Sequence, residues 1–221
     1  GGDDFLGVLY KPNAQLSPKT CIDWFTTFKS EIWNNLGQTP EHPQKPITVS
    51  LGFVWAGPKV PQREVLQHCR EAEKSAKTNG KDRLALRILF NDGQHLEWVC
   101  PWRFLPILQQ YRDRSGNQNW THLFNDIAVL ESRHAFANDH TDVAIALFKI
   151  YFGENNNTLD PENWWNSIET LENGEQRPVG GILGERDRYT TDGAIHKAIN
   201  NWVINLAKVG FHLHRQNVDK A

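Results

Sequence analysis

The stretch SLGFVWAGPKVPQREVLQHCREAEKSAKTNGKDRLALRIL, residues 50–89, contains a strand pattern, a helix pattern and a second strand pattern. The first strand is predicted over residues 47–56, which are β-branched and almost continuously apolar, as in a strand covered on both faces. Apolar residues at helical spacing follow over residues 61–79, and Gly80 can end that helix. Residues 84–90 then return to an apolar strand. This alternation indicates a protein that mixes helices and strands in one region.

The neighbouring segments extend this region in both directions. Residues 84–90 and 95–100 are predicted strands joined by the turn NDGQ, a combination typical of a β-hairpin. Upstream, residues 5–10 (FLGVLY) predict a strand, and residues 13–37 predict a helix with a buried apolar stripe.

From residue 101 onward the patterns predict helices and no further strand. Helical spacing covers residues 102–114, 120–136 and 142–152. The last helix begins at Thr191 or Asp192, and its apolar residues recur at steps of three and four. This apolar face consists of Ile195, Ile199, Trp202, Leu206 and Val209.

The change of pattern predicts two domains, residues 1–105 and residues 106–221. The first contains helices and strands, and the second is predicted to be an all-α helical bundle. A chain of 221 residues with 39% hydrophobic content can bury cores of this size. The expected fold class is therefore α+β.

Composition excludes several classes of protein. The formal net charge of −2 gives no global basic field of the kind that binds nucleic acid, although a local groove can still be basic within this average. Cys21, Cys69 and Cys100 lack the spacing of a zinc site or a disulfide framework, so we expect reduced and mostly buried thiols. No apolar stretch reaches the roughly 18 residues that a membrane span needs, and the first residues are acidic where a secretory signal is basic. We expect a cytoplasmic protein that does not bind membranes.

The chain begins GGDDFLGVLY, with two glycines and two acids directly before an apolar run. Gly1 and Gly2 admit backbone angles that a side chain forbids, and the carboxylates of Asp3 and Asp4 are the hard oxygen ligands that magnesium or manganese prefers. The same residues are also typical of an ordinary turn. Because a hairpin turn with only one strand leaves an unpaired edge, we expect that an N-terminal half is missing from this chain.

Two lysines near the end of the helix predicted at residues 61–79 favour the interpretation of Asp3 and Asp4 as metal ligands. Lys77 lies on its last turn, and Lys81 directly follows the glycine that ends it. Both cations could meet the phosphates of a nucleotide whose metal ions bind Asp3 and Asp4. Cations at the C-terminus of a helix are also favourable in themselves.

The motifs GGDDF (residues 1–5) and AKTNGKD (residues 76–82) resemble those of the nucleotidyl cyclase superfamily. Diguanylate cyclases carry GG(D/E)EF and, downstream, AKxxGRN with the same internal spacing. The closer resemblance is to the large, polymerase-like subunit of type III CRISPR effector complexes, whose palm carries GGDD followed by a strand. Residues 50–89 resemble three consecutive parts of that subunit. These are a strand that begins Ser-x-Gly, a helix that ends with the motifs AEK and AK, and a turn with the motif GKD. A helical domain after the palm is also similar to that family.

The resemblance implies a partial ferredoxin-like palm that joins ATP molecules into cyclic oligoadenylates when the guide RNA of the complex pairs with target RNA. Asp3 and Asp4 would hold two Mg²⁺ or Mn²⁺ ions, and Gly1 and Gly2 would let the backbone approach the nucleotide. The implied partners are other CRISPR effector subunits, guide RNA and target RNA.

The same resemblance implies that Lys77 and Lys81 contact phosphates and that Ser50 contacts the nucleotide. This sequence departs from the family because the first palm strand, with its metal-binding acid, is absent, as are a nuclease domain and a second palm. We therefore expect the chain alone not to be a competent enzyme. A scaffold subunit of the same kind of complex and, more distantly, a diguanylate-type signalling cyclase are the alternatives.

Three other features are interpreted structurally. The nine histidines show no paired metal-ligand spacing. The stretch GGILGERDRYT, residues 180–190, lacks the pattern of a phosphate-binding loop and is predicted to be a loop leading to a helix cap. Trp164 and Trp165 are adjacent aromatic residues of the kind that form a core or a partner interface.

Overall fold

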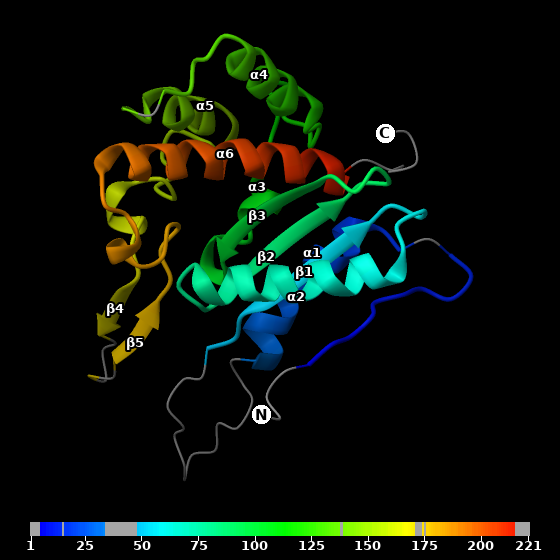
Figure 1. Cartoon of the computed structure of the whole chain (residues 1–221). Helices are drawn as coiled ribbons and strands as arrows, with labels where there is room; N and C mark the ends of the chain where they lie inside the picture. The colour runs from blue at the N-terminus through cyan, green and yellow to red at the C-terminus, as the bar shows by residue number, and fades with distance from the viewer. Residues whose placement is uncertain are drawn as a thin grey trace.

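A computed structural model describes residues 5–14, 16–33, 48–137, 139–170, 174 and 176–214 of the chain (Figure 1). These residues form a three-stranded sheet, a separate two-stranded hairpin and a set of helices that pack around the larger sheet. The fold class is α+β, as the sequence predicts. No helix in these ranges is long and apolar enough to cross a membrane.

The larger sheet contains β1 (Leu51–Ala56), β2 (Arg83–Leu89) and β3 (His95–Pro101) in that spatial order. β1 and β2 run parallel, whereas β2 and β3 form an antiparallel hairpin. The parallel pair is connected by α2 (Gln62–Thr78), which crosses one face of the sheet. The predicted helix and the two predicted hairpin strands are confirmed here, and the first strand is confirmed over its second half.

Gly52 on β1 determines how closely α2 approaches the sheet. A Cβ atom at this position would lie 2.3 Å from the backbone nitrogen of Glu73 and 2.8 Å from the carbonyl oxygen of Cys69. The helix backbone therefore rests directly on the strand. Small side chains continue this close contact along the same face, because Ala72 and Ala76 of α2 pack on Ala85 of β2.

The opposite face of the sheet carries the main core. Leu84, Leu86 and Ile88 of β2 alternate with the residues that face α2, and they join one large cluster with α6 (Asp192–His214). The residues of α6 that the sequence predicts as its apolar face are all buried. This cluster continues across residue 105, so the two predicted regions, residues 1–105 and residues 106–221, share one core.

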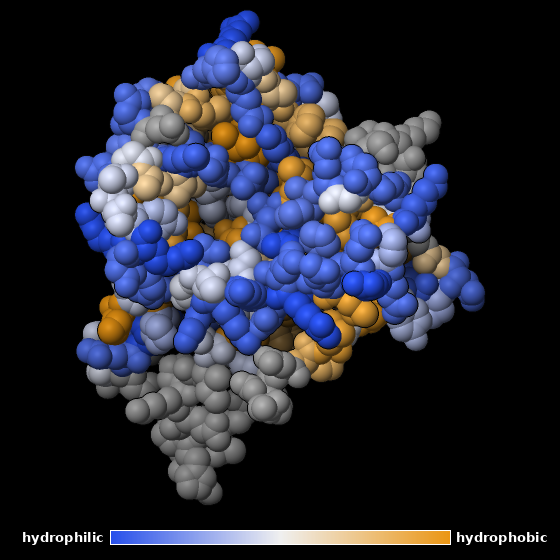
Figure 2. Space-filling view, in the orientation of Figure 1, coloured by the Kyte–Doolittle hydropathy of each residue, from blue (hydrophilic) through white to orange (hydrophobic). Residues whose placement is uncertain are grey.

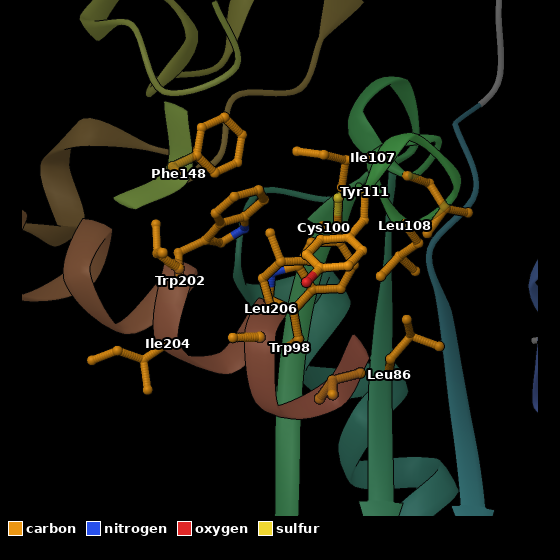
Figure 3. Close-up of a cluster of buried hydrophobic side chains, with 14 of the residues drawn as sticks. Leu86, Trp98, Cys100, Ile107, Leu108, Tyr111, Phe148, Trp202, Ile204 and Leu206 are labelled. Carbon is orange, nitrogen blue, oxygen red and sulfur yellow. The ribbon is translucent and has the colours of Figure 1, made fainter. Parts of the chain in front are cut away.

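Aromatic side chains fill the centre of this core (Figure 3). The rings of Trp98 on β3 and Trp202 on α6 lie 5.2 Å apart, and Trp202 Nε1 donates a hydrogen bond of 2.9 Å to the carbonyl of Val99. Tyr111 stacks on Trp120 with ring centroids 4.1 Å apart. The contacts of Trp202 with β3 fix α6 on the sheet, since large aromatic rings bury much apolar area and tolerate few arrangements.

The remaining helical segments are mostly short. Their bounds are α1 (Pro18–Thr27) with the π-helical turn η1 (Phe28–Ile32), η3 (Trp102–Phe104), α3 (Ile107–Gln110), α4 (Thr121–Ser132), α5 (Asp142–Phe152), η4 (Pro161–Asn163) and η5 (Arg186–Arg188). Helices α1, α4 and α5 among them contact α6. The prediction of one helix over residues 102–114 is wrong. Pro106 and the turn after Gln110 divide this segment into η3 and the short α3.

Two predictions about strands are wrong. Residues 5–10 form no strand, and their apolar side chains are exposed, with Phe5 at 93% and Tyr10 at 77% of full exposure. An extended segment needs a neighbouring strand for its backbone groups, and the described chain provides none there. The region predicted as all-α contains the hairpin of β4 (Ser167–Thr170) and β5 (Gln176–Val179), whose short and mostly exposed strands lack an apolar pattern.

The three cysteines agree with the sequence expectation. Cys21 and Cys100 are buried, Cys69 is half-buried, and none of the three forms a disulfide. Burial raises the pKa of the Cys100 thiol, which keeps it protonated.

In the view of Figure 2 hydrophilic residues cover most of the surface, and apolar residues form separate patches.

We expect Gly52→Ala to destabilise the protein because its new methyl group would collide with the α2 backbone, which cannot rotate away. The expected loss of unfolding free energy is about 3 kcal/mol, corresponding to a melting temperature lowered by roughly 10 °C. Circular dichroism melting measures the change.

Gly7→Ala is the matched control, because a Cβ there would meet only the movable ring of Phe5. It should melt like the unaltered protein. If Gly52→Ala also did so, the direct contact between α2 and β1 would be refuted.

Candidate functional site

The structure places three of the predicted site residues at one end of the larger sheet. Leu51 pairs with Leu84 in the parallel register, so Ser50 lies beside the start of β2. Because α2 returns the chain to this end, Lys77 on its last turn and Lys81 in the following turn lie here as well. Gly1, Gly2, Asp3 and Asp4 lie outside the described residues, so their predicted roles stay predictions.

The two lysines differ in their surroundings. Lys77 forms an ion pair with Glu73, one helical turn earlier on α2, and both side chains are partly exposed. Lys81 is exposed and forms no ion pair with a carboxylate in the described ranges. The positive charge of Lys81 is therefore less compensated than that of Lys77.

The turn between α2 and β2 has an unusual backbone. Gly80, Lys81 and Asp82 have φ angles of +113°, +60° and +47°. Left-handed angles are uncommon for residues other than glycine, and a run of them persists only where surrounding contacts hold it. The Asp82 carboxylate is 2.9 Å from Lys29 Nζ, and the carbonyl of Lys81 accepts a hydrogen bond of 2.9 Å from Arg83 Nε.

A distant segment covers this turn, and we call residues 180–189 the docked loop. Its Gly184 packs so tightly that a Cβ would lie 2.0 Å from the carbonyl oxygen of Asn79. Asn166, just before β4, donates a hydrogen bond of 2.9 Å to the carbonyl of Gly80 and accepts one of 2.9 Å from the backbone of Gly181. Arg188 donates a hydrogen bond of 2.9 Å to Asn79 Oδ1.

Arg83 links the sheet to the docked loop. Its side chain is fully buried, and it donates hydrogen bonds to the carbonyls of Gly181 (3.0 Å) and Ile182 (3.3 Å) and to Asn166 Oδ1 (3.1 Å). Burial lowers the pKa of the Arg83 guanidinium to about 10, so the group remains charged at neutral pH. Carbonyl oxygens take the place of a paired carboxylate here.

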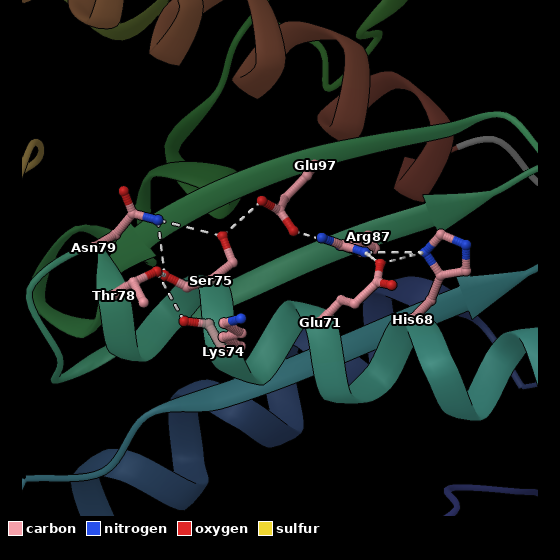
Figure 4. Close-up of polar contacts among 8 residues, drawn as sticks. All are labelled: His68, Glu71, Lys74, Ser75, Thr78, Asn79, Arg87 and Glu97. Atoms are coloured by element: carbon pink, nitrogen blue, oxygen red, sulfur yellow. Dashed lines mark hydrogen bonds and ion pairs between the residues drawn. The ribbon is translucent and has the colours of Figure 1, made fainter.

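A polar network lies between α2 and the sheet (Figure 4). Arg87 of β2 is paired with Glu97 of β3 and, at 2.7 Å, with Glu71 of α2, and it donates a hydrogen bond of 3.0 Å to His68 Nδ1. Burial acts to lower the pKa of Arg87, but its hydrogen bonds to Glu97 and Glu71 raise it above the ordinary value. Because these charges are already paired, the network holds α2 on the sheet and offers no free reactive group.

The same network reaches the candidate site. Ser75 donates a hydrogen bond of 2.7 Å to Glu97, and Asn79 Nδ2 donates one of 2.7 Å to the carbonyl of Ser75. These contacts fix the Asn79 amide with its oxygen toward Arg188. The end of α2 is thus held from both the sheet and the docked loop.

A separate hollow of about 290 Å³ lies between α4 and α6. It is lined by Glu131, His134, Phe136, Lys197, Asn200, Asn201 and Ile204. Ser50, Lys77 and Lys81 are not among these lining residues.

Within the described ranges, no group of three or more histidine, cysteine or acidic side chains is arranged to hold a metal ion. The predicted metal ligands are Asp3 and Asp4, and the donor chemistry of two carboxylates suits Mg²⁺ or Mn²⁺.

We found no family model, no curated protein and no solved structure that matches this chain.

Sequence reasoning missed Arg83, Asn166 and Arg188. Asn79 and Arg188 are 109 residues apart in the chain, and no local pattern relates them. The glycines of residues 180–184 were the available signal, because they permit the close approach at Gly184, but the same composition is typical of many loops.

We expect Arg83→Ala to lower the free energy of unfolding by at least about 3 kcal/mol, because hydrogen bonds from a charged donor are lost and the carbonyl of Ile182 loses its donor. Denaturant titration measures this. Arg177→Ala is the control, since Arg177 is exposed and pairs with Glu169 across the exposed β4–β5 hairpin. Equal stability of the two variants would contradict the anchoring role of Arg83.

Proposed function

We propose that the chain is part of the large subunit of a type III CRISPR effector complex, and that its palm joins ATP molecules into cyclic oligoadenylates when target RNA pairs with the guide RNA. This proposal rests on one observation: Ser50, Lys77 and Lys81 all lie at the same end of the parallel strands β1 and β2. These are the residues at which the sequence resembles the nucleotide-binding strand, helix and turn of that family.

The left-handed turn supports the same proposal. A strained backbone that many contacts hold in place is typical of functional sites. Here it presents Lys81 to solvent directly after the end of α2. A lysine in this position can neutralise one phosphate of a bound triphosphate, and Lys77 can neutralise another.

The chemistry requires attack by a ribose 3′-hydroxyl on the α-phosphorus of the next ATP. The new oxygen–phosphorus bond replaces the bond to pyrophosphate, which departs, and the hydroxyl proton passes to solvent water. Asp3 and Asp4 would hold the Mg²⁺ or Mn²⁺ ions that supply charge stabilisation for this step. The residues of this chain at the turn would bind and orient the triphosphate.

Other effector subunits, guide RNA and target RNA are the proposed partners, and no membrane is involved.

The direct test uses the purified assembly that contains this chain, with target RNA, labelled ATP and Mg²⁺ or Mn²⁺. We expect cyclic oligoadenylates from the unaltered assembly and none from the Asp3→Ala/Asp4→Ala variant, because the metal ligands are lost. Assembly itself should be unchanged, as judged by size-exclusion chromatography. Asp139→Ala, which removes a carboxylate that is 85% exposed, is the control and should leave product formation intact.

The outcomes separate the alternatives. Product from the double variant would refute the metal assignment. RNA binding without product in the unaltered assembly would favour a non-catalytic scaffold subunit. Use of GTP in preference to ATP would favour a diguanylate-type signalling cyclase.

The two lysines should contribute unequally. We expect Lys81→Gln to weaken ATP binding by about tenfold, a typical effect of losing one charge-assisted phosphate contact. Lys77→Gln should have a smaller effect, because Glu73 already offsets the charge of Lys77. Titration calorimetry of the assembly measures both, and a larger effect at Lys77 would contradict this assignment.

A further inference from the structure

We infer that Arg188, on the docked loop, is a third phosphate-contacting cation of the proposed nucleotide site. This inference rests on the proposed function and adds to it a residue far from the motifs in the sequence. It also makes the docked loop part of the site, since that loop brings Arg188 to the end of α2.

The position of Arg188 is the first support. Its Nη1 donates a hydrogen bond of 2.9 Å to Asn79 Oδ1, and Asn79 stands between Lys77 and Lys81 in the chain. A guanidinium group carries five N–H donors, so this one contact leaves others for a ligand. Arg188 is exposed and can reach a ligand without rearrangement of the core.

The orientation of Asn79 is the second support. Its Nδ2 donates to the carbonyl and, at 3.3 Å, to the hydroxyl of Ser75, which leaves Oδ1 to face the docked loop. Ser75 is held in turn by Glu97 (Figure 4). Arg188 therefore meets a fixed acceptor, and a positioned guanidinium loses little entropy when it binds a phosphate.

The local charge is the third support. Neither Lys81 nor Arg188 forms an ion pair with a carboxylate in the part of the chain that the structure describes. Of the nearby acids, Asp82 is paired with Lys29, whereas Glu185 accepts a hydrogen bond of 2.7 Å from the neutral amide of Asn166 and keeps its negative charge. Asp187, directly before Arg188 in the chain, is a further exposed acid, so the acids offset the cations only in part. Burial is the main cause that lowers the pKa of Arg83; the charge of Arg188 also lowers it, and Asp82 acts in the opposite direction. A bound polyphosphate would compensate these charges.

The competing explanation is that Arg188 only stabilises the C-terminus of α2. A cation there is favourable for the helix dipole, and its hydrogen bond to Asn79 would also hold the turn. The two explanations differ in what they predict for ligands with and without phosphates. A structural role would affect adenosine and a triphosphate equally, whereas a phosphate contact affects only the triphosphate.

The experiment measures dissociation constants by titration calorimetry on the assembly containing the full chain. The probes are adenosine and α,β-methylene-ATP, which cannot release pyrophosphate and so reports binding alone. We expect Arg188→Ala to weaken binding of the triphosphate about tenfold and to leave binding of adenosine unchanged. Arg188→Lys should recover part of the affinity because it restores the charge.

Arg186→Ala is the matched control. Arg186 lies two residues away on the same short helix and is exposed, but its guanidinium stacks over Trp165 at 5.4 Å and does not bond to Asn79. This variant should bind both probes like the unaltered assembly.

Each other outcome has a distinct meaning. If Arg188→Ala binds the triphosphate normally, the inference about Arg188 is overturned while the proposed function stands. If adenosine and the triphosphate weaken equally, Arg188 has only a structural role and the inference is again overturned. If the unaltered assembly binds no triphosphate, the proposed function fails and the inference fails with it.

Discussion

The buried guanidinium of Arg83 is the interaction on which the organisation of this end of the molecule depends. It begins the central strand β2, it is fully buried, and it bonds to carbonyls of the docked loop and to Asn166. Removing a charged group from water is costly unless its donors are satisfied, and here the protein satisfies them with backbone oxygens and one amide. The position of the docked loop is therefore tied to the first residue of β2, and the turn preceding β2 is held in place as a consequence.

The rest of the fold explains why that end is rigid. The sheet is covered by α2 on one face and by α6 on the other, and the two contacts differ in kind. On the α2 side, Gly52 and small alanines allow the backbones to approach closely, and the paired charges around Arg87 fix the helix along its length. On the α6 side, large aromatic rings such as Trp98 and Trp202 fill the space. Because both faces of the sheet are covered, the turn between α2 and β2 is attached to a rigid part of the protein.

Local pattern was sufficient for some of this architecture and not for the rest. The periodicity of residues 61–79 and of α6, and the hairpin signal at residues 91–94, identified α2, α6, β2 and β3, since each has an apolar face determined by its own sequence. The strand predicted at residues 5–10 failed because a strand depends on a neighbour that local sequence cannot supply. The β4–β5 hairpin was missed because its strands are short, mostly exposed and polar. For the candidate site, the motif residues Ser50, Lys77 and Lys81 could be located from sequence, whereas the contacts of Asn166, Gly184 and Arg188 depend on tertiary packing.

The turn at Gly80–Asp82 depends on tertiary contacts of this kind. Two non-glycine residues in left-handed conformation would be unfavourable in an isolated helix–turn–strand segment. The cost is offset by contacts from three separate parts of the chain: Lys29 near the N-terminal helix, Arg83 at the start of β2, and Asn166 with the docked loop. The conformation of the turn is consequently a property of the whole shared core and not of α2 and β2 alone. A site built on such a turn depends on residues that no motif includes, and its geometry responds to any change that shifts the docked loop relative to the sheet.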